Sequence, residues 1–272
     1  MNLNKKYNKS ERRKGLIVFI DALGTKSVWN REDPLKYLKS WKGIIKSLRN
    51  EKKFISRVFK EVCLIDKEEN MPKLDIASFS DTIILTLSFS LDIINKNEIN
   101  YKEHSREMLI FLGSALKENF YKTIMQDKIF LRGVVSYGDF YKMDSFLIGP
   151  AIDEAAMWYD KAEWFGISAT PSAKYFIEGT DIAKEGDIFI RYQIPMKDGK
   201  TTDSYVISWP YFASLSTKIL ENIDDIYYES RTQLLESFCS NKVIDKSSYL
   251  KYDNTLKFFD DIYKIFCRRL KD

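Results

Sequence analysis

The sequence is short of the two residue types on which much enzyme chemistry depends. It has one histidine, His104, and three widely spaced cysteines, Cys63, Cys239 and Cys267. Because no Cys-x-x-Cys pair occurs, the spacing predicts neither a disulfide framework nor a thiolate zinc site. Zinc sites built on two or three histidines cannot form within one such chain. We expect His104, in the charged segment 101–107, at a solvated helix start rather than in a catalytic triad.

Long apolar runs and secretion signals are also missing. The run Gly15–Ile20 is far shorter than the ~20 residues that span a bilayer. Residues 1–14 are rich in Lys, Arg and Asn and contain no apolar segment, so we expect no secretion signal, no membrane partner and a cytoplasmic location. The net charge of +4 is spread over both signs. It requires no nucleic-acid partner and is compatible with an anionic small substrate.

The residues that are present predict a packed α+β protein. Hydrophobic residues make up 44% of the chain, enough for one large domain or one domain with an extension. We divide it into a basic flexible arm at 1–14, a core domain at 15–180 and a C-terminal extension at 181–272. The extension is expected to pack on the core domain and to contain strands at 188–194 and 204–209 and helices at 211–222, 225–240 and 246–269.

The order of elements in the core domain indicates its topology. Apolar runs predict strands, and apolar residues at helical spacing predict helices. The strands are expected at 15–21, 74–79, 82–89, 129–137, 140–148 and 164–169, and the helices at 34–50, 103–125 and 150–163. Ser80-Asp81 and Gly138-Asp139 are the expected hairpin turns. This order predicts a ferredoxin-like βαββαβ core with a mostly antiparallel sheet.

Two carboxylates stand out by their position in this topology. Asp21 ends the first buried strand, and Asp81 lies at the tip of a hairpin whose strands are expected beside it. Paired carboxylates with no histidine nearby suit a hard cation such as Mg²⁺ or Mn²⁺, which is typically shared with substrate phosphates. The alternative is structural, with Asp21 capping its turn and Asp81 filling an ordinary hairpin position.

Two further features point to phosphate. The segment Asp21–Thr25 is a Gly-containing turn before a helix, which can present backbone N–H groups to an anion, although no Walker motif occurs in the chain. Arg132 falls on a predicted core strand, where a buried guanidinium needs an anionic partner. A solvated strand-edge arginine or a structural ion pair remains the alternative for Arg132.

Three separated segments resemble the class III nucleotide cyclase catalytic domain, the adenylate/guanylate cyclase fold. Val18–Thr25 is similar to that family's first strand and metal-binding turn, and Ala77–Ile84 to its second metal-binding hairpin. Leu131–Gly138 and Phe146–Ala156 are similar to its later strand, turn and helix. The resemblance covers about residues 15–171, and the tail after about residue 180 has no match.

The resemblance implies a two-metal mechanism. Asp21 and Asp81, with the carbonyl of Ala22, would hold two divalent ions, Mg²⁺ or Mn²⁺. The ribose 3′-hydroxyl of a nucleoside triphosphate would attack the α-phosphorus in line, and pyrophosphate would leave. Family members build each active site across a dimer interface, so a homodimer is implied. The residues implied to bind the phosphates are Gly24, Thr25 and Arg132.

The positions that the family uses to select a purine are apolar in this chain. Adenylate cyclases carry a Lys where this sequence has Ala77, and a polar second selector where it has Phe146. Discriminating contacts of this kind are worth about 1–3 kcal/mol each when buried. Ala77, Phe79, Phe146 and Asp153 are the base-pocket candidates. Tyr37 and Trp41 are plausible pocket neighbours, although core packing explains them better.

The helix that supplies the family's transition-state donors also departs from the pattern. Its Asn is Asp153 here, and the Arg four residues later is Met157. Lys161 or Arg132 is the candidate substitute. A cyclase-like module that binds nucleotides without turnover therefore remains an alternative, as does a purine cyclase. A polymerase-like palm shares the core topology, but no GGDEF-like run occurs.

Among cyclases without purine readers, the sequence is most similar to the pyrimidine cyclases of the Pycsar anti-phage defence system. The compact format, the Asp21–Gly24 turn and the segment Gly149–Asp153 carry this resemblance. It implies conversion of UTP or CTP, with UTP favoured, to cyclic UMP or cyclic CMP. The cyclic nucleotide would then activate a downstream effector.

Overall fold

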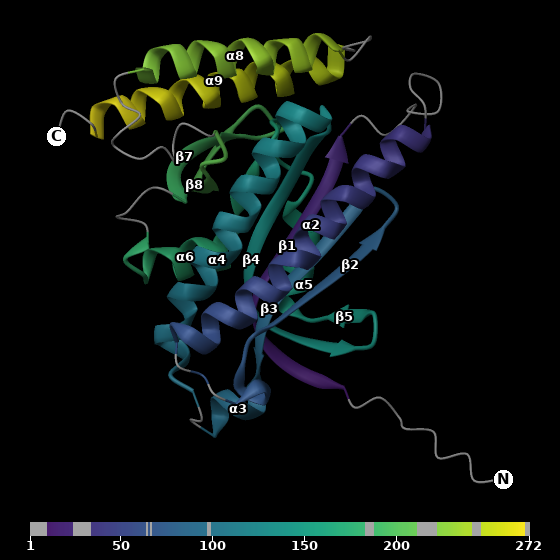
Figure 1. The fold of residues 1–272 in the computed structure, drawn as a ribbon, viewed down its shortest axis with the longest axis vertical. Coiled ribbons are helices and arrows are strands. Elements are labelled where there is room, and N and C mark those ends of the chain that lie inside the picture. Colours follow the sequence, from purple (N-terminus) through teal and green to yellow (C-terminus); the bar gives the residue numbers. More distant parts are fainter. Residues whose placement is uncertain are drawn as a thin grey trace.

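A computed structural model describes residues 10–23, 34–63, 65, 67–96, 99–182, 188–210, 222–240 and 246–269. Within these residues, an eight-stranded sheet carries helices on both faces, and a helical pair lies across one end (Figure 1). Most strand pairings are antiparallel, so the predicted α+β class is confirmed. No described helix has an apolar stretch long enough to cross a bilayer.

The centre of the sheet has the predicted βαββαβ topology. The strands β2, β3, β1 and β4 lie in that order, and each neighbouring pair is antiparallel. One helix connects β1 to β2 and another connects β3 to β4. The bounds of these elements are β1 (Glu11–Leu23), α2 (Pro34–Glu61), β2 (Lys73–Phe79), β3 (Thr82–Ser90), α4 (Tyr101–Lys122) and β4 (Phe130–Met143).

Strand β1 is buried on both faces, as its continuous apolar run predicts. Successive side chains of a strand point to opposite faces. Leu16, Val18 and Ile20 belong to the main hydrophobic core, which includes the buried residues of α2 and α4. Ile17 and Phe19 belong to a second cluster with α5 (Pro150–Trp158) on the opposite face.

The second half of the chain extends the same sheet. β6 (Ile167–Ala169) pairs in parallel with β4, and the hairpin of β7 (Phe189–Pro195) and β8 (Thr201–Ile207) continues the sheet beyond it. The segment predicted as an extension after residue 180 therefore contributes two strands to the central sheet. The helix α6 (Pro171–Glu178) lies between β6 and β7 in the chain and was not expected from the sequence.

Two long helices, α8 (Ile223–Ser240) and α9 (Lys246–Arg269), lie side by side at one end of the sheet (Figure 1). α9 is attached to the loop before β6, because the backbone N–H of Phe165 donates to Thr255 Oγ1 at 2.8 Å. The side chain of Phe258 packs on the Trp164 ring, with centroids 4.6 Å apart. Both helices match the predicted ones, whereas the helix expected at 211–222 lies almost wholly outside the described residues.

The predicted turn at Gly138-Asp139 is wrong. β4 runs straight through both residues, and Gly138 pairs with Gly15 of β1. A Cβ on Gly15 would lie 2.2 Å from the Leu87 carbonyl oxygen, so a residue without a side chain is required at this crowded point of the sheet. The chain turns later, at Asp144, whose φ is 53°, and returns as the short strand β5 (Phe146–Ile148).

Several element boundaries also differ from the predicted ones. α2 continues eleven residues beyond the expected 34–50, because Ile55 and Phe59 prolong its buried stripe. α5 ends at Trp158 rather than at 163. Two short helical turns were not expected from the sequence: η1 (Glu68–Asn70) and α3 (Leu91–Asn95). The turn η2 (Thr123–Asp127) continues α4 two residues beyond the predicted end at 125.

The basic arm predicted at residues 1–14 is wrong over its last four residues. Residues 11–14 belong to β1 and pair with β4. Arg13 is buried because its guanidinium lies between Glu11 and Asp75, and its Nη1 is 3.1 Å from the Asp75 carboxylate. Residues 1–9 lie outside the described part of the chain.

His104 does not lie at a solvated helix start. Only 8% of its surface is exposed, and its ring packs against Phe59 and Phe89 with both centroid distances at 6.3 Å. The adjacent charged residues Lys102 and Glu103 are exposed, whereas residues four apart on a helix share a face. His104 shares the buried stripe of α4 with Met108 and Leu112.

Candidate active site

Asp21 lies near the end of β1, between the two strands that flank it. The register pairs it with Thr82 of β3 and with Arg132 of β4. Directly opposite residues in antiparallel strands project to the same face. Arg132 Nη2 therefore lies 3.4 Å from Asp21 Oδ2, and the side chains retain 5% and 19% of their exposure, respectively. This ion pair is mostly buried and lies at one end of the central strands.

Asp81 is held beside Asp21 by the backbone. The N–H of Ala22 donates to the Asp81 carbonyl oxygen at 3.0 Å, which attaches the β2–β3 hairpin tip to the end of β1. Ser80 closes the two-residue turn with φ at 54°, a left-handed conformation that is uncommon for a residue with a side chain. The structure thus brings Asp21, Ala22 and Asp81 together, as their sequence positions indicate.

The charges at this end of the sheet are crowded. Burial raises the pKa of Asp21, and the neighbouring Asp81 charge raises it further. Arg132 acts in the opposite direction, and Asp160, from the loop after α5, adds a smaller upward contribution. Carboxylates placed this closely favour a cation between them. The single buried guanidinium offsets only part of their negative charge.

Arg132 has one donor to spare. Its Nη1 donates to the Ala162 carbonyl oxygen at 3.2 Å, and Nη2 faces Asp21. Its Nε is buried and has no hydrogen-bond partner among the described residues. Arg132 therefore makes the structural ion pair that its sequence position left open, and it retains an N–H group that a phosphate oxygen could accept.

The hydroxyl of Tyr37 is a further polar group at this site. Tyr37 lies in the first turn of α2, and its ring stacks on Trp41 with centroids 6.3 Å apart. Burial raises the pKa of Tyr37, and the charges of Asp81 and Asp21 raise it further, so its hydroxyl keeps its proton at neutral pH. The buried oxygen has no hydrogen-bond partner within the described residues. Core packing explains the position of the Tyr37 ring, but it does not explain why a hydroxyl group is buried there.

The donor atoms gathered here fit a hard divalent cation. The carboxylates of Asp21 and Asp81 and the backbone carbonyl of Ala22 offer oxygen, the ligand that Mg²⁺ and Mn²⁺ prefer. Asp160, which the sequence did not single out, forms ion pairs with Lys161 at 3.5 Å and Lys197 at 3.6 Å. The predicted phosphate ligands Gly24 and Thr25 lie outside the described residues.

The base-pocket candidates fall into two groups. Phe79 pairs with Thr82 beside Asp81 and is 84% exposed, and Ala77 lies two residues further along β2. Phe146 lies at the opposite end of the sheet. Phe146 pairs with Met143 at the end of β4. The neighbouring residue of β4, Lys142, pairs with Glu11, which is ten residues before Asp21 on β1. At 3.3 Å per residue this separation is about 33 Å, so one chain does not bring Phe146 to Asp21.

The remaining predicted site residues lie on or just after α5. Asp153 is exposed on the first turns of the helix. Lys161 is 57% exposed in its side chain and adjoins Ala162, the residue whose carbonyl accepts from Arg132. Lys161 is therefore next in the chain to a residue that contacts Arg132, and its Nζ pairs with Asp160 at 3.5 Å.

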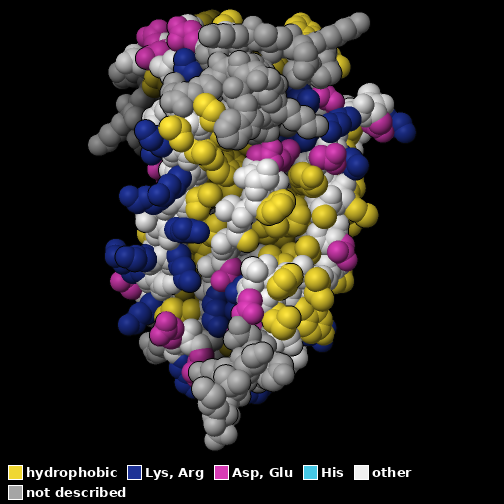
Figure 2. All heavy atoms as spheres, turned by 90° about the vertical axis from the view of Figure 1, so that its right-hand side faces the viewer, with side chains coloured by type: hydrophobic (Ala, Val, Ile, Leu, Met, Phe, Trp, Pro, Cys, Tyr) yellow, Lys and Arg dark blue, Asp and Glu magenta, His cyan; other side chains and the backbone are white. Residues whose placement is uncertain are grey.

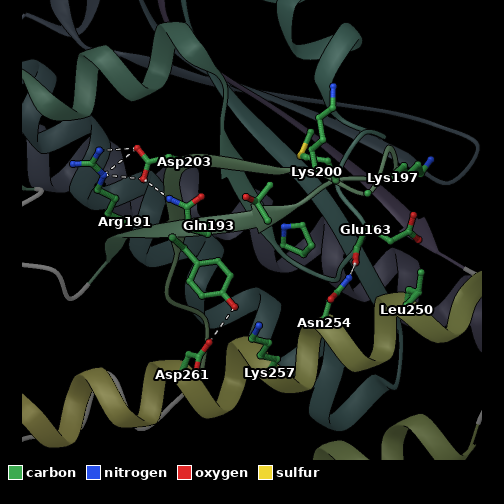
Figure 3. A pocket seen from close by; sticks show the side chains of 15 residues that line it. Glu163, Arg191, Gln193, Lys197, Lys200, Asp203, Leu250, Asn254, Lys257 and Asp261 are labelled. Carbon is green, nitrogen blue, oxygen red and sulfur yellow. Dashed lines mark hydrogen bonds and ion pairs between the residues drawn. The ribbon is translucent and has the colours of Figure 1, made fainter.

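A separate hollow of about 750 Å³ lies between the β7–β8 hairpin and α9 (Figure 3). Its wall is mixed, with Lys197 and Lys200 on the hairpin and Lys257 on α9 beside the apolar side chains of Pro195, Met196 and Leu250. Asn254 donates to the Glu163 carbonyl oxygen at 2.8 Å and closes one side. Asp21, Asp81 and Arg132 are not part of its lining, so the hollow is distinct from the carboxylate site.

No model of a known protein family matches this chain, and no curated protein matches its sequence. Several solved structures are similar to parts of it. The catalytic core of a rhodopsin-guanylyl cyclase with converted specificity, in complex with ATPαS, is 11% identical, with a TM-score of 0.46 over 73% of this chain and 96% of that one. A bacterial light-regulated adenylyl cyclase is 12% identical, with a TM-score of 0.46 over 86% of this chain and 60% of that one. The adenylyl cyclase CyaB from P. aeruginosa is 15% identical, with a TM-score of 0.39 over 73% of this chain and 95% of that one.

Proposed function

We propose that this protein is a nucleotide cyclase that converts a pyrimidine nucleoside triphosphate to the 3′,5′-cyclic monophosphate and pyrophosphate. UTP is the favoured substrate and CTP the second. The observation that carries the proposal is the meeting of Asp21, Asp81 and the buried Arg132 at one end of the central strands. This arrangement combines ligands for a hard cation with a donor for phosphate.

In the proposed reaction a bond forms between the ribose 3′-oxygen and the α-phosphorus. The bond from that phosphorus to the pyrophosphate oxygen breaks, and the 3′-hydroxyl proton passes to solvent. Divalent ions held by Asp21, Asp81 and the Ala22 carbonyl would activate the 3′-hydroxyl and offset the charge of the triphosphate. Arg132 binds a phosphate oxygen through its unpaired Nε, and its Nη1 bond to Ala162 fixes the direction of the guanidinium.

Tyr37 supplies a neutral donor next to the carboxylates. Its raised pKa keeps the hydroxyl protonated, so the group can donate to a carboxylate or to a phosphate oxygen without adding negative charge. The ring is held by its stacking on Trp41. In the proposed site Tyr37 therefore orients charged oxygens rather than transferring a proton.

The proposed preference for a pyrimidine rests on the apolar residues at the two positions that would contact the base. Neither Ala77 nor Phe146 offers a hydrogen-bond donor or acceptor to read a purine edge. Phe146 is 69% exposed and can stack on the face of a smaller base. Without polar readers, a purine would lose contacts worth about 1–3 kcal/mol each.

A homodimer would complete the proposed site. Phe146 lies about 33 Å from Asp21 along the sheet of one chain, so a second copy must supply it if both residues contact one nucleotide. Figure 2 shows hydrophobic side chains gathered over much of one face. The exposed large apolar residues on β2, the β4–β5 hairpin and α5 are Phe79, Tyr141, Met143, Phe146, Ile148 and Met157. An apolar surface of this kind suits association with another protein surface.

The role of the product follows from the resemblance to the pyrimidine cyclases of anti-phage defence. In this proposal the cyclic nucleotide is a second messenger that activates a separate effector protein. The chain itself needs no contact with that effector, because the diffusing product links the two.

The experiment is product analysis with each of the four nucleoside triphosphates separately in the presence of Mn²⁺. Chromatography and mass spectrometry should find cyclic UMP, or cyclic CMP, together with pyrophosphate. Turnover of ATP or GTP alone would contradict the pyrimidine preference while preserving a cyclase.

A second candidate is a cyclase-like module that binds nucleotides without turnover. It is favoured by the exposed Asp153 and Met157, which stand where the family carries its transition-state donors. Saturable nucleotide binding with no product from any triphosphate would support this candidate and contradict catalysis.

A further inference from the structure

A thiol, an imidazole and a carboxylate meet where the end of α2 contacts the start of α4. Cys63 follows α2 by two residues, and His104 and Glu107 lie three residues apart on α4, a spacing that places them on one face. The Cys63 sulfur, a ring nitrogen of His104 and a carboxylate oxygen of Glu107 all lie within 4.8 Å of one another. We propose that these three residues bind a divalent transition-metal ion, with zinc as the preferred ion.

Two buried polar atoms of this cluster have no hydrogen-bond partner within the described part of the chain. His104 is 8% exposed, and its Nδ1 is buried without a hydrogen-bond partner in the part of the chain that the structure describes. The Oε2 atom of Glu107 is also buried and unpartnered among those residues. Buried polar atoms are almost always satisfied in proteins, so these atoms indicate a missing ligand. A bound cation would satisfy both side chains.

The donor types are those that zinc accepts. Thiolate, imidazole and carboxylate are its three usual protein ligands, and a site with three of them leaves a fourth position for water. Bond lengths of 2.0–2.3 Å in a tetrahedron place ligand atoms about 3.3–3.8 Å apart, so the three atoms must draw together by about an ångström. A hard ion such as Mg²⁺ would not select the sulfur.

The charge around the thiol also favours a cation. Burial and, after it, the charges of Glu107 and Glu103 raise the pKa of the Cys63 thiol. The negative charges of both carboxylates therefore lie near enough to the sulfur to disfavour its thiolate form when no cation is bound. A dication balances one thiolate and one carboxylate, with His104 neutral. The surrounding rings of Phe59 and Phe89 limit the access of water to the imidazole.

This metal site is separate from the proposed catalytic site. Tyr37 and Glu61 lie at opposite ends of α2, and 24 residues of helix span about 36 Å. A metal at Cys63 would join the end of α2 to the start of α4, which are far apart in the sequence. The expected consequence is stabilisation of the metal-bound fold, because the ion binds the folded chain. The proposal does not depend on nucleotide turnover.

Cobalt(II) tests the site, because a thiolate bound to cobalt gives a charge-transfer band that oxygen ligands do not give. The full-length protein is freed of metal with a chelator, titrated with Co²⁺ and then challenged with Zn²⁺. We expect a stoichiometric band that Zn²⁺ removes. Cys63→Ser should abolish the band, and Glu107→Gln should weaken Co²⁺ binding by more than about tenfold. If Cys63→Ser does not fold, the wild-type band and Glu107→Gln still decide the matter.

Two controls separate this site from the rest of the molecule. Cys267→Ser, in α9, should leave the band unchanged, and so should Asp21→Asn, which removes a carboxylate of the other site. Absence of the charge-transfer band in the wild-type protein would overturn the proposal. A band that survives in Cys63→Ser, or that disappears in Cys267→Ser, would overturn it equally.

Discussion

Asp21 and Arg132 are partners in the register of β1 and β4, and the guanidinium Nη2 lies 3.4 Å from the carboxylate Oδ2. The pair lies at the end of the central strands, where Asp81 adds a second carboxylate. Arg132 thus has two duties in the proposed site. It limits the repulsion between the carboxylates, and it presents to an incoming anion an Nε that has no partner among the residues that the structure describes.

Two substitutions of Arg132 distinguish its binding of phosphate from its ion pair with Asp21. Arg132→Lys keeps a positive charge near Asp21 but loses the planar donor geometry, so we expect kcat/KM for the triphosphate to fall about 10- to 100-fold with the fold retained. Arg132→Met leaves Asp21 without its buried partner and should lower the free energy of unfolding by about 3–5 kcal/mol. Steady-state kinetics and urea denaturation measure the two effects. Unchanged kinetics in Arg132→Lys would rule out phosphate binding by this residue.

Tyr37→Phe tests whether the Tyr37 hydroxyl has a function. The substitution removes a buried oxygen that has no hydrogen-bond partner among the described residues, so stability should not fall. If the hydroxyl orients charged oxygens, kcat/KM should drop about 10- to 150-fold, because one charged hydrogen bond is worth about 1.5–3 kcal/mol. Kinetics and thermal unfolding of the same preparation distinguish the two roles. Normal turnover in the variant would leave Tyr37 as a packing residue only.

Phe146→Asp tests the proposed dimer. A charge on the exposed apolar surface of the β4–β5 hairpin should oppose association, so sedimentation should show a monomer and turnover should be lost. The circular dichroism spectrum should not change, because the side chain is 69% exposed in one chain. Tyr249→Asp, at an exposed aromatic residue of α9, is the matched control and should preserve both the dimer and the activity. A fully active monomer would contradict the shared site.

A cluster around Asp203 predicts how stability depends on pH. The Asp203 carboxylate accepts from Arg191 at 2.7 Å and from Lys174 at 3.0 Å, and these bonds hold its pKa below the ordinary value of 3.8. A carboxyl group with a lowered pKa stabilises the fold fully when the pH is above the ordinary pKa of the group. This stabilisation is lost as the pH falls through the lowered pKa. The cluster ties α6 to the β7–β8 hairpin.

Asp203→Asn should therefore destabilise the protein at about pH 7, and the difference from wild type should shrink as the pH drops below about 3.8. Urea unfolding of both proteins across this range measures the effect. Asp198→Asn, whose side chain is 60% exposed and 3.9 Å from Lys200, is the control and should show little difference at any pH. A difference for Asp203→Asn that does not vary with pH would exclude the ionic explanation.

The central topology and the meeting of Asp21 with Asp81 could be predicted, because both follow from the order of strands. A βαββαβ order places the first strand beside the hairpin, whatever the side chains are. Asp160 and the Tyr37 hydroxyl could not be placed, because their positions depend on where α5 ends and on how α2 packs. Such packing joins residues that lie in different elements of the chain, and local spacing carries no signal for it.

The two clearest errors have local explanations. Gly138-Asp139 has the composition of a turn, but Gly138 lies inside β4 opposite Gly15, at a φ of 152° that few residues other than glycine adopt. His104 has charged neighbours in the sequence, yet it lies four residues before the buried Met108 and on the same face of α4. Counting residues at helical spacing from Met108 backwards would have indicated that His104 is buried.

The most direct test of the central claim compares the wild-type protein with Asp21→Asn in an equal mixture of the four nucleoside triphosphates and Mn²⁺. Asp92→Asn, an exposed acid on α3, serves as the matched control. We expect cyclic UMP or cyclic CMP from the wild type and the control, and a loss on the order of 10³-fold or more in Asp21→Asn. Equal product from Asp21→Asn and wild type would contradict the carboxylate-based mechanism.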